Sequence, residues 1–428
     1  NDPVQIALSR IRQLSAHEVG HTLGFAHNFA ASSNDRASVM DYPAPFVRVG
    51  QGGDLDFSAA YDVGIGEWDK VTTMWLYRQY TEGVDESAAG DALLESARAS
   101  GLRYIDDPQG RGVGTAHPYA SVWDNGADPV ASLLNVMQVR DVALENFGLN
   151  VLQSGEPTSR LRAAIVPIYL YHRYQVNAAA KMIGGYEFHY AETGEADAAG
   201  APVPASQQRA ALDALVATLD PAVLDLPNDT LDLLTPPLVS FRGAGAGAEY
   251  FPGETGAMFD LLTAADTSAS QTLSALFHPQ RVARLIETQR RDAGALGYGE
   301  VLAKVEATLF VGAETPRQAG ILHREQIRYV STLIELSASS AATPAAVAQT
   351  NAYLSSLKDR LSKRQRRMAA SDTAVRAELG RRIAAHLDRP SPAALPSSSA
   401  VDIPPGSPIG AGSAESCWHC DTLLGPLQ

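Results

Sequence analysis

The stretch that decides the interpretation of this chain is His17-Glu18-Val19-Gly20-His21-Thr22-Leu23-Gly24-Phe25-Ala26-His27, which has the pattern HExxHxxGxxH. His17 and His21 are four positions apart, so on a helix their imidazoles lie on one face, one turn apart. Gly24 lacks a Cβ and lets the chain leave the helix in a sharp turn, which allows His27 to return as a third ligand. Three imidazoles leave the fourth position of a zinc ion (Zn2+) open to water, as in catalytic rather than structural sites.

The alternative interpretation is that these are unrelated surface or core histidines. It requires five fixed positions to coincide by chance, which makes the full pattern much more specific than HExxH alone. Glu18 adjoins the first ligand and can reach a zinc-bound water without being a ligand itself. The pattern therefore predicts His17, His21 and His27 as metal ligands and Glu18 as the general base.

A second motif follows at Ser38-Val39-Met40-Asp41-Tyr42-Pro43, with Met40 thirteen residues after His27. A methionine in a turn is often no more than a filler of an irregular core, because its thioether is flexible and polarizable. After a complete HExxHxxGxxH, the favoured interpretation is a turn that places a methionine beneath the zinc ligands.

These two motifs together resemble those of the metzincin metallopeptidases, and more closely those of large bacterial zinc-dependent metalloproteases in which HEVGHTLGxxHN precedes SVMDYP. The resemblance implies His17, His21 and His27 as ligands, Glu18 as general base and Met40 as the Met-turn residue. It extends to about residue 390 through segments that are similar to that family's downstream helical region: Ala116-His117-Pro118, Trp123-Asp124-Asn125-Gly126, Tyr171-His172-Arg173-Tyr174 and Lys181-Met182-Ile183-Gly184-Gly185.

Tyr42 stands two places after the turn methionine. In some metzincins a tyrosine at this position binds zinc in the resting enzyme and then stabilises the oxyanion. The resemblance thus implies a catalytic role for Tyr42, and a packed or capping tyrosine is the alternative.

The beginning of the chain departs from the metzincin pattern. Metzincins place a mixed β-sheet before the active-site helix, and its edge strand binds the substrate backbone. Only sixteen residues precede His17 here, and the chain opens Asn1-Asp2-Pro3 without a signal peptide. We therefore expect a fragment or a processed form that lacks the N-terminal part.

Composition narrows the class of protein. Of 428 residues, 45% are hydrophobic and 19% charged, which is ordinary for a folded chain. The 34 basic and 48 acidic residues give a net charge of −14, which argues against nucleic acid as a partner because binding to phosphates needs a basic surface. No apolar run reaches the roughly 18 residues that a transmembrane segment needs.

Hydrophobic spacing and capping residues predict a mainly α fold. It comprises the C-terminal half of a metzincin catalytic domain, over residues 1–90, and a mostly helical domain over residues 91–389. Helices are expected at 4–24, 67–80, 129–147, 157–183 with a possible kink at Pro167, and 206–219, 258–277, 279–292, 298–310, 317–338 and 344–388. Residues 83–126 are expected to be mixed and glycine-rich, and 226–256 to be a loop region.

The last segment, residues 390–428, is rich in Pro, Ser, Ala and Gly, and is expected to be a flexible tail. It contains Cys417 and Cys420 in a CxxC pattern. A local disulfide or idle thiols, opportunistic metal binding and a redox pair all remain open for these cysteines.

The sequence as a whole predicts a zinc-dependent endopeptidase that acts on a peptide or protein substrate, with zinc as its cofactor. Resemblance alone suggests a secreted or periplasmic location. The alternatives are a non-catalytic zinc-containing binding module, a fragment that is inactive without an upstream sheet, and a hydrolase of other carbonyl compounds. The oligomeric state is left open.

Overall fold

The computed structural model describes residues 2–193, 200–237, 248–363 and 369–389. Within them the chain is mainly α-helical, as the sequence predicts. The helices are α1 (Pro3–Thr22), α2 (Glu67–Tyr77), α3 (Glu86–Ala99), α4 (Asp107–Arg111), α5 (Pro129–Glu145), α6 (Leu161–Tyr169), α7 (Arg173–Met182), α8 (Ala205–Ala217), α9 (Pro221–Leu224), α10 (Asn228–Leu233), α11 (Leu261–Leu276), α12 (Pro279–Arg291), α13 (Tyr298–Leu309), α14 (Pro316–Ala338), α15 (Pro344–Ser362) and α16 (Ala370–Leu387).

The strands of the described residues form two small antiparallel hairpins. In the first, β1 (Arg48–Val49) pairs with β2 (Leu55–Asp56), and Arg48 lies opposite Asp56. In the second, β3 (Tyr186–Phe188) pairs with β4 (Gly200–Pro202), and Tyr186 lies opposite Pro202.

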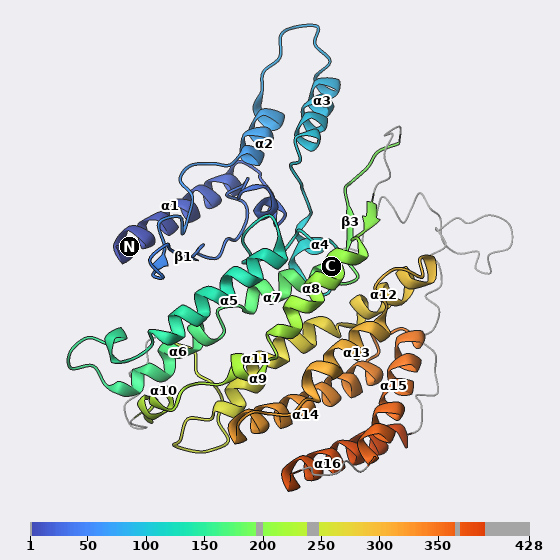
Figure 1. Cartoon of the computed structure of the whole chain (residues 1–428). Coiled ribbons are helices and arrows are strands. Elements are labelled where there is room, and N and C mark those ends of the chain that lie inside the picture. The colour runs from blue at the N-terminus through green and yellow to red at the C-terminus, as the bar shows by residue number, and fades with distance from the viewer. Residues whose placement is uncertain (1, 194–199, 238–247, 364–368, 390–428) are drawn as a thin grey trace, which may run out of the picture.

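The helices after residue 129 form a layered bundle, which we call the helical region (residues 129–389). Figure 1 shows α5, α7, α11 and α14 as successive rows, with α15 and α16 at the end of the series, and neighbouring rows are in contact. One continuous apolar core runs through this region from Leu133 in α5 to Ile383 in α16.

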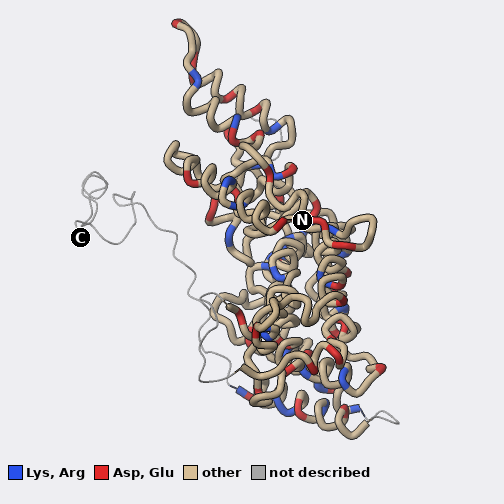
Figure 2. The backbone as a smooth tube through the Cα atoms, turned by 90° about the vertical axis from the view of Figure 1, so that its left-hand side faces the viewer, with Lys and Arg blue, Asp and Glu red and all other residues tan. Residues whose placement is uncertain are grey.

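Residues 2–125, which we call the site region, lie at the other end of the molecule. Figures 1 and 2 show α2 and α3 projecting at the top, above the end of α1. Figure 2 also shows acidic and basic positions interspersed along the chain. The buried apolar clusters of the site region are small: Phe25, Val39 and Met40 form one, and Ala30, Ile105 and Ala120 another.

Helix α1 has clear start and stop signals. The side chain of Asp2 accepts a hydrogen bond from the backbone N–H of Val4, and Pro3 occupies the first turn. At the other end, the N–H groups of Gly24 and Phe25 bond back to the carbonyls of His21 and Gly20 in a Schellman motif. Gly24 has a φ of 90°, a left-handed conformation that favours glycine. This turn redirects the chain toward His27.

The prediction of one helix over 157–183 is wrong, because the structure has two helices, α6 and α7. The break lies just after Pro167, at Leu170–His172. The carbonyl oxygen of Tyr169, the last residue of α6, accepts a hydrogen bond from the buried guanidinium of Arg140. A long-range side chain thus occupies a carbonyl that a continuing helix would use.

Several other expected boundaries also differ. Residues 83–126 contain two helices, α3 and α4, which were not predicted because the segment is rich in glycine. Gly90 lies within α3, where the absence of a Cβ permits close packing against Trp75 of α2. The stretch 344–388 contains two helices rather than one, and the loop region 226–256 contains α10. The expected domain boundary at residue 90 stays a prediction, and that residue lies inside α3.

The predicted tail, with Cys417 and Cys420, lies outside the described residues, so the alternatives for its cysteines stay open. No helix in the described part of the chain combines the length and the apolar character needed to cross a bilayer.

Candidate metal centre

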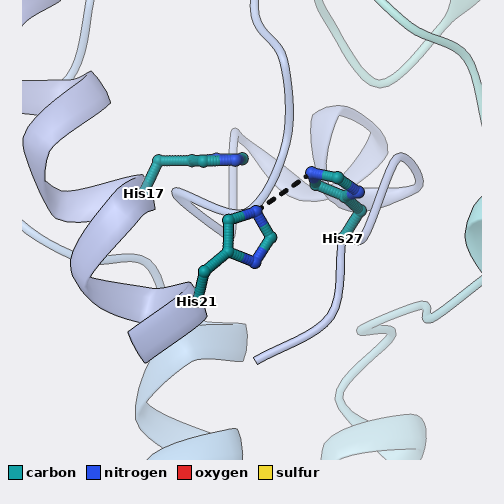
Figure 3. Close-up of side chains that lie close together, drawn as sticks. All are labelled: His17, His21 and His27. Atoms are coloured by element: carbon teal, nitrogen blue, oxygen red, sulfur yellow. Dashed lines mark hydrogen bonds between the residues drawn. The ribbon is translucent and has the colours of Figure 1, made fainter. Parts of the chain in front are cut away.

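The three histidines of the first motif meet at one point. His17 and His21 project from α1, and His27 reaches them from the segment after the Gly24 turn (Figure 3). One nitrogen from each ring lies within 4.8 Å of the corresponding nitrogens of the other two. Within the described residues, this is the one group of three or more His, Cys, Asp or Glu side chains with such geometry.

Each of the three rings has an oxygen acceptor facing its Nδ1 atom. Nδ1 of His17 lies 2.7 Å from the carbonyl oxygen of Val39, and Nδ1 of His21 lies 3.0 Å from that of Phe25. Nδ1 of His27 lies 2.8 Å from a carboxylate oxygen of Asp107. Because these oxygens only accept, each Nδ1 carries a proton, and each neutral ring presents the lone pair of its Nε2.

This donor set fits a zinc ion. The Nε2 atoms of His21 and His27 lie 3.2 Å apart, the contact marked in Figure 3. Two nitrogens that bind one tetrahedral zinc at about 2.0–2.1 Å are separated by about 3.3 Å. Without a cation, the contact requires a doubly protonated imidazolium, because both Nδ1 atoms already face acceptors. With a cation, all three rings are neutral and every nitrogen has a partner.

The charge environment of the first ligand also favours the neutral ring. His17 is buried, and burial lowers its pKa, although the hydrogen bond to the Val39 carbonyl opposes this effect. The side chain of Glu18 is exposed on α1, and its negative charge acts on His17 in the direction that raises the pKa. The carboxylate of Glu18 is therefore close to the first ligand yet open to solvent.

The second motif forms a turn directly beneath α1. Met40 is buried, and a Cβ at Gly20 of α1 would overlap its sulfur, so glycine allows the helix and the turn to meet. Asp69 of α2 holds the turn: its carboxylate accepts from the hydroxyl of Ser38 at 2.6 Å and from the N–H of Val39 at 2.9 Å. The same Val39 supplies the carbonyl that faces His17.

Tyr42 lies beside two of the three histidines. Its ring centroid lies 5.1 Å from that of His17 and 4.9 Å from that of His27. On another side it stacks on Trp123 at 5.3 Å. Packing and catalysis are both compatible with this placement, so the role of Tyr42 stays a prediction.

Two buried carboxylates lie behind the Met-turn. Asp41 accepts from the backbone N–H of Ser32, and Asp124 accepts from the hydroxyl of the same residue. Burial raises the pKa of both groups, and for Asp41 the neighbouring Asp124 adds to the effect. Nearby, the N–H of Trp123 donates to the carbonyl of Tyr42, so residues 123–124 brace the turn.

Sequence reasoning missed the residues that contact the three histidines and the Met-turn. Asp107 and Arg111 of α4, and Asp69 of α2, give no signal in the sequence, because each acts across a long loop. Asn28 was visible only as the residue after the third histidine. It is fully buried; its N–H donates to the carbonyl of Met40, and its side-chain amide donates to the carbonyl of Arg103. It therefore joins the third ligand, the Met-turn and the segment that leads to α4.

A helix with two histidines, a glycine turn to a third and a buried methionine beneath them define the metzincin class of zinc proteins. The chain belongs to the Met-zincin family, whose family model matches residues 1–316. The match covers the metal centre and the helical region into the start of α14. No match to the chain was found among curated proteins or solved structures. Family membership indicates a metallopeptidase-like hydrolase with zinc as its metal.

Proposed function

We propose that the chain is a zinc-dependent endopeptidase, with His17, His21 and His27 as zinc ligands and Glu18 as the general base. The observation that carries the proposal is the pairing of all three Nδ1 atoms with oxygen acceptors. This pairing fixes the tautomers and aims three Nε2 lone pairs at one point. Membership of the Met-zincin family supports the same class of chemistry.

A zinc ion bound there would act as a Lewis acid, polarising the scissile carbonyl and lowering the pKa of water toward about 7. Glu18 accepts a proton from the water that adds to the carbonyl carbon. The carboxyl group then delivers this proton to the amide nitrogen as the C–N bond breaks, so that the leaving group departs as a neutral amine. The exposed position of Glu18 beside His17 supports this role.

Tyr42 is proposed as an oxyanion donor. Its ring lies against two of the proposed ligands, and its phenol can donate a hydrogen bond to a carbonyl oxygen that gains negative charge. Arg111 carries its guanidinium carbon 5.5 Å from the centre of the same ring. This cation favours negative charge on that side of the site.

The substrate is proposed to be a peptide or protein, and a secreted or periplasmic location belongs to the same proposal. Both rest on family resemblance. The net charge of −14 supports the expectation that nucleic acid is not the substrate.

The test is hydrolysis of a mixed peptide library by the zinc-loaded chain, with zinc content measured in parallel. The Glu18→Ala variant is expected to keep one zinc per chain and to lose roughly 10²–10⁴-fold in kcat, the range for loss of a general base. Glu145→Ala, which removes an exposed glutamate from the end of α5, is the matched control and should leave both quantities unchanged.

Three results would count against parts of the proposal. Full activity of Glu18→Ala would exclude Glu18 as the base. A wild-type chain that holds one zinc and cleaves no library peptide would leave an incomplete enzyme or a non-catalytic zinc-binding module, and repeating the assay with upstream sequence restored would decide between these two. An unchanged kcat in Tyr42→Phe would leave Tyr42 with a packing role only.

A further inference from the structure

The short helix α4 lies beside the metal centre, although its sequence carries no recognisable motif. Asp107, its first residue, faces Nδ1 of His27 with one carboxylate oxygen. Arg111, one turn later, donates to both oxygens of that carboxylate, at 2.7 and 2.8 Å. This bidentate pair fixes the carboxylate in one orientation. The guanidinium of Arg111 also lies over the ring of Phe29, 5.0 Å from the ring centroid.

The carboxylate of Asp107 is one half of an ion pair. Both of its oxygens accept from the guanidinium of Arg111, and one of them also faces Nδ1 of His27. The acceptor opposite His27 is therefore the carboxylate of a bidentate ion pair. An anionic acceptor orients an imidazole more strongly than a neutral carbonyl does, and raises the basicity of the opposite nitrogen.

A buried lysine of the helical region holds α4 in position. Lys181 of α7 donates from its ammonium to the carbonyl oxygens of Gly110 and Ala120, each at 2.6 Å. Only 2% of this residue is exposed. Gly110 lies in α4 itself. Ala120 precedes Ser121, whose N–H donates to the carbonyl of Phe29, two residues after the third histidine.

The position of this lysine is unfavourable for a charged group, which points to a positional role. Burial lowers the pKa of Lys181 to about 7, although the nearby Asp124 opposes the effect. The fold nevertheless buries this amino group and directs its N–H bonds to two backbone carbonyls.

Two arginines of α12 hold the next part of the same segment. Arg281 donates to the carbonyl of Val113 at 2.7 Å, and Arg284 donates to that of Gly114 at 2.9 Å. Side chains from two helices of the helical region, α7 and α12, therefore hold residues 110–120 by hydrogen bonds to backbone carbonyls.

We infer that α4 belongs to the metal centre because Asp107 orients the imidazole of His27. Lys181 of the helical region holds α4 in the position from which Asp107 reaches that ring. The inference rests on the proposed zinc site. It gives the helical region a role in metal binding, because its contacts with the segment 110–120 determine where Asp107 lies.

The test measures zinc affinity of the full chain by competition with a chromophoric chelator, together with the visible spectrum of the cobalt-substituted protein. Asp107→Asn is expected to bind zinc roughly 10–100-fold more weakly, the range for loss of an outer-shell partner, and to shift the cobalt bands. Glu378→Gln is the matched control, because Glu378 is also a carboxylate that binds an arginine four residues later. It should change neither quantity.

The link to the helical region is tested in the same assay. Lys181→Met removes both donors and is expected to weaken zinc binding by several-fold, and Lys181→Arg, which keeps the donors, should restore it. If Lys181→Met does not fold, Lys181→Gln replaces it in the assay. The glutamine amide is shorter than the lysine side chain, so zinc binding is again expected to be several-fold weaker.

The outcomes separate the two proposals. A wild-type chain that binds no zinc overturns the proposed function. A wild-type chain that binds zinc while Asp107→Asn matches its affinity and cobalt spectrum overturns the positioning role of Asp107 alone. Normal zinc affinity in folded Lys181→Met, or in the Lys181→Gln variant that replaces it, overturns the part played by the helical region.

Discussion

The site region and the helical region are held together by different interactions. In the helical region, apolar side chains from α5 to α16 form one continuous core. In the site region, the apolar clusters have three buried members each. Its segments are joined instead by polar side chains, chiefly the buried Asn28 and Asp69 and the half-buried Asp107.

This difference shows how a metal centre can be assembled where there is little core. Hydrogen bonds to backbone groups specify position, but each contributes only about 1 kcal/mol net. The site region must therefore draw stability from elsewhere, and the structure offers two sources. One is the metal, and the other is the contact with the helical region through Lys181, Arg281 and Arg284.

The largest expected effect is the response to removal of zinc. Binding to the folded state alone stabilises by about 4 kcal/mol when free zinc is 1,000 times Kd. We expect a chelator to accelerate amide hydrogen exchange across residues 25–42, while α11 and α14 keep their protection. Equal loss of protection in both regions would contradict the comparison, and re-addition of zinc is the control for irreversible damage.

The next effect is that of a cavity in the helical core. Leu379 of α16 is fully buried, and Leu379→Ala should lower the free energy of unfolding by roughly 2–5 kcal/mol. Because α16 packs on α14 and α15, at the end of the bundle away from the site region (Figure 1), the folded variant should bind zinc as the wild type does. The control is Leu134→Ala, at an exposed position of α5, which should change stability by less than about 0.5 kcal/mol. A weakened zinc site in folded Leu379→Ala would show that the two regions are less separate than described.

The smallest effect is that of a change of one pH unit. His172 is buried in the helical region, and burial, helped by the charge of Arg140, lowers its pKa to about 3. The unfolded chain takes up a proton near pH 6.5 that the native ring resists, so His172 lowers stability as the pH falls from about 6.5 toward 3, by about 1.4 kcal/mol per unit. Urea unfolding at several pH values should give a flatter acid slope for His172→Gln. Buried carboxyl groups affect both proteins alike, so equal slopes would refute the assignment.

Features of the metal centre that depend on neighbouring residues could be predicted from the sequence, whereas those that depend on distant contacts could not. His17, His21 and the turn at Gly24 are within one helix and its cap, so local periodicity and a glycine suffice to predict their arrangement. Met40 could be anticipated from its motif. Gly20 could also have been informative, because a glycine inside a helix is unfavourable and calls for a reason. The reason here is packing: the absence of a Cβ leaves room for the sulfur of Met40.

The remainder depends on contacts that are distant in sequence. Asp107 is 80 residues from His27, and nothing in a single sequence pairs them. The break between α6 and α7 depends in the same way on Arg140, a side chain from another helix that takes the carbonyl of Tyr169. Long helices of the bundle were predictable because their apolar periodicity is strong, whereas the polar contacts that complete the metal centre have no period.

X-ray absorption at the zinc edge of the full chain, loaded with one equivalent of zinc, measures which atoms surround the metal. If three imidazoles bind one zinc ion in the site region, the first shell contains nitrogen and oxygen at about 2.0–2.1 Å, with multiple-scattering features of three imidazoles and no sulfur. A zinc–sulfur distance of about 2.3 Å would place the metal on the cysteines at 417 and 420 instead, and would exclude a centre built from the three histidines.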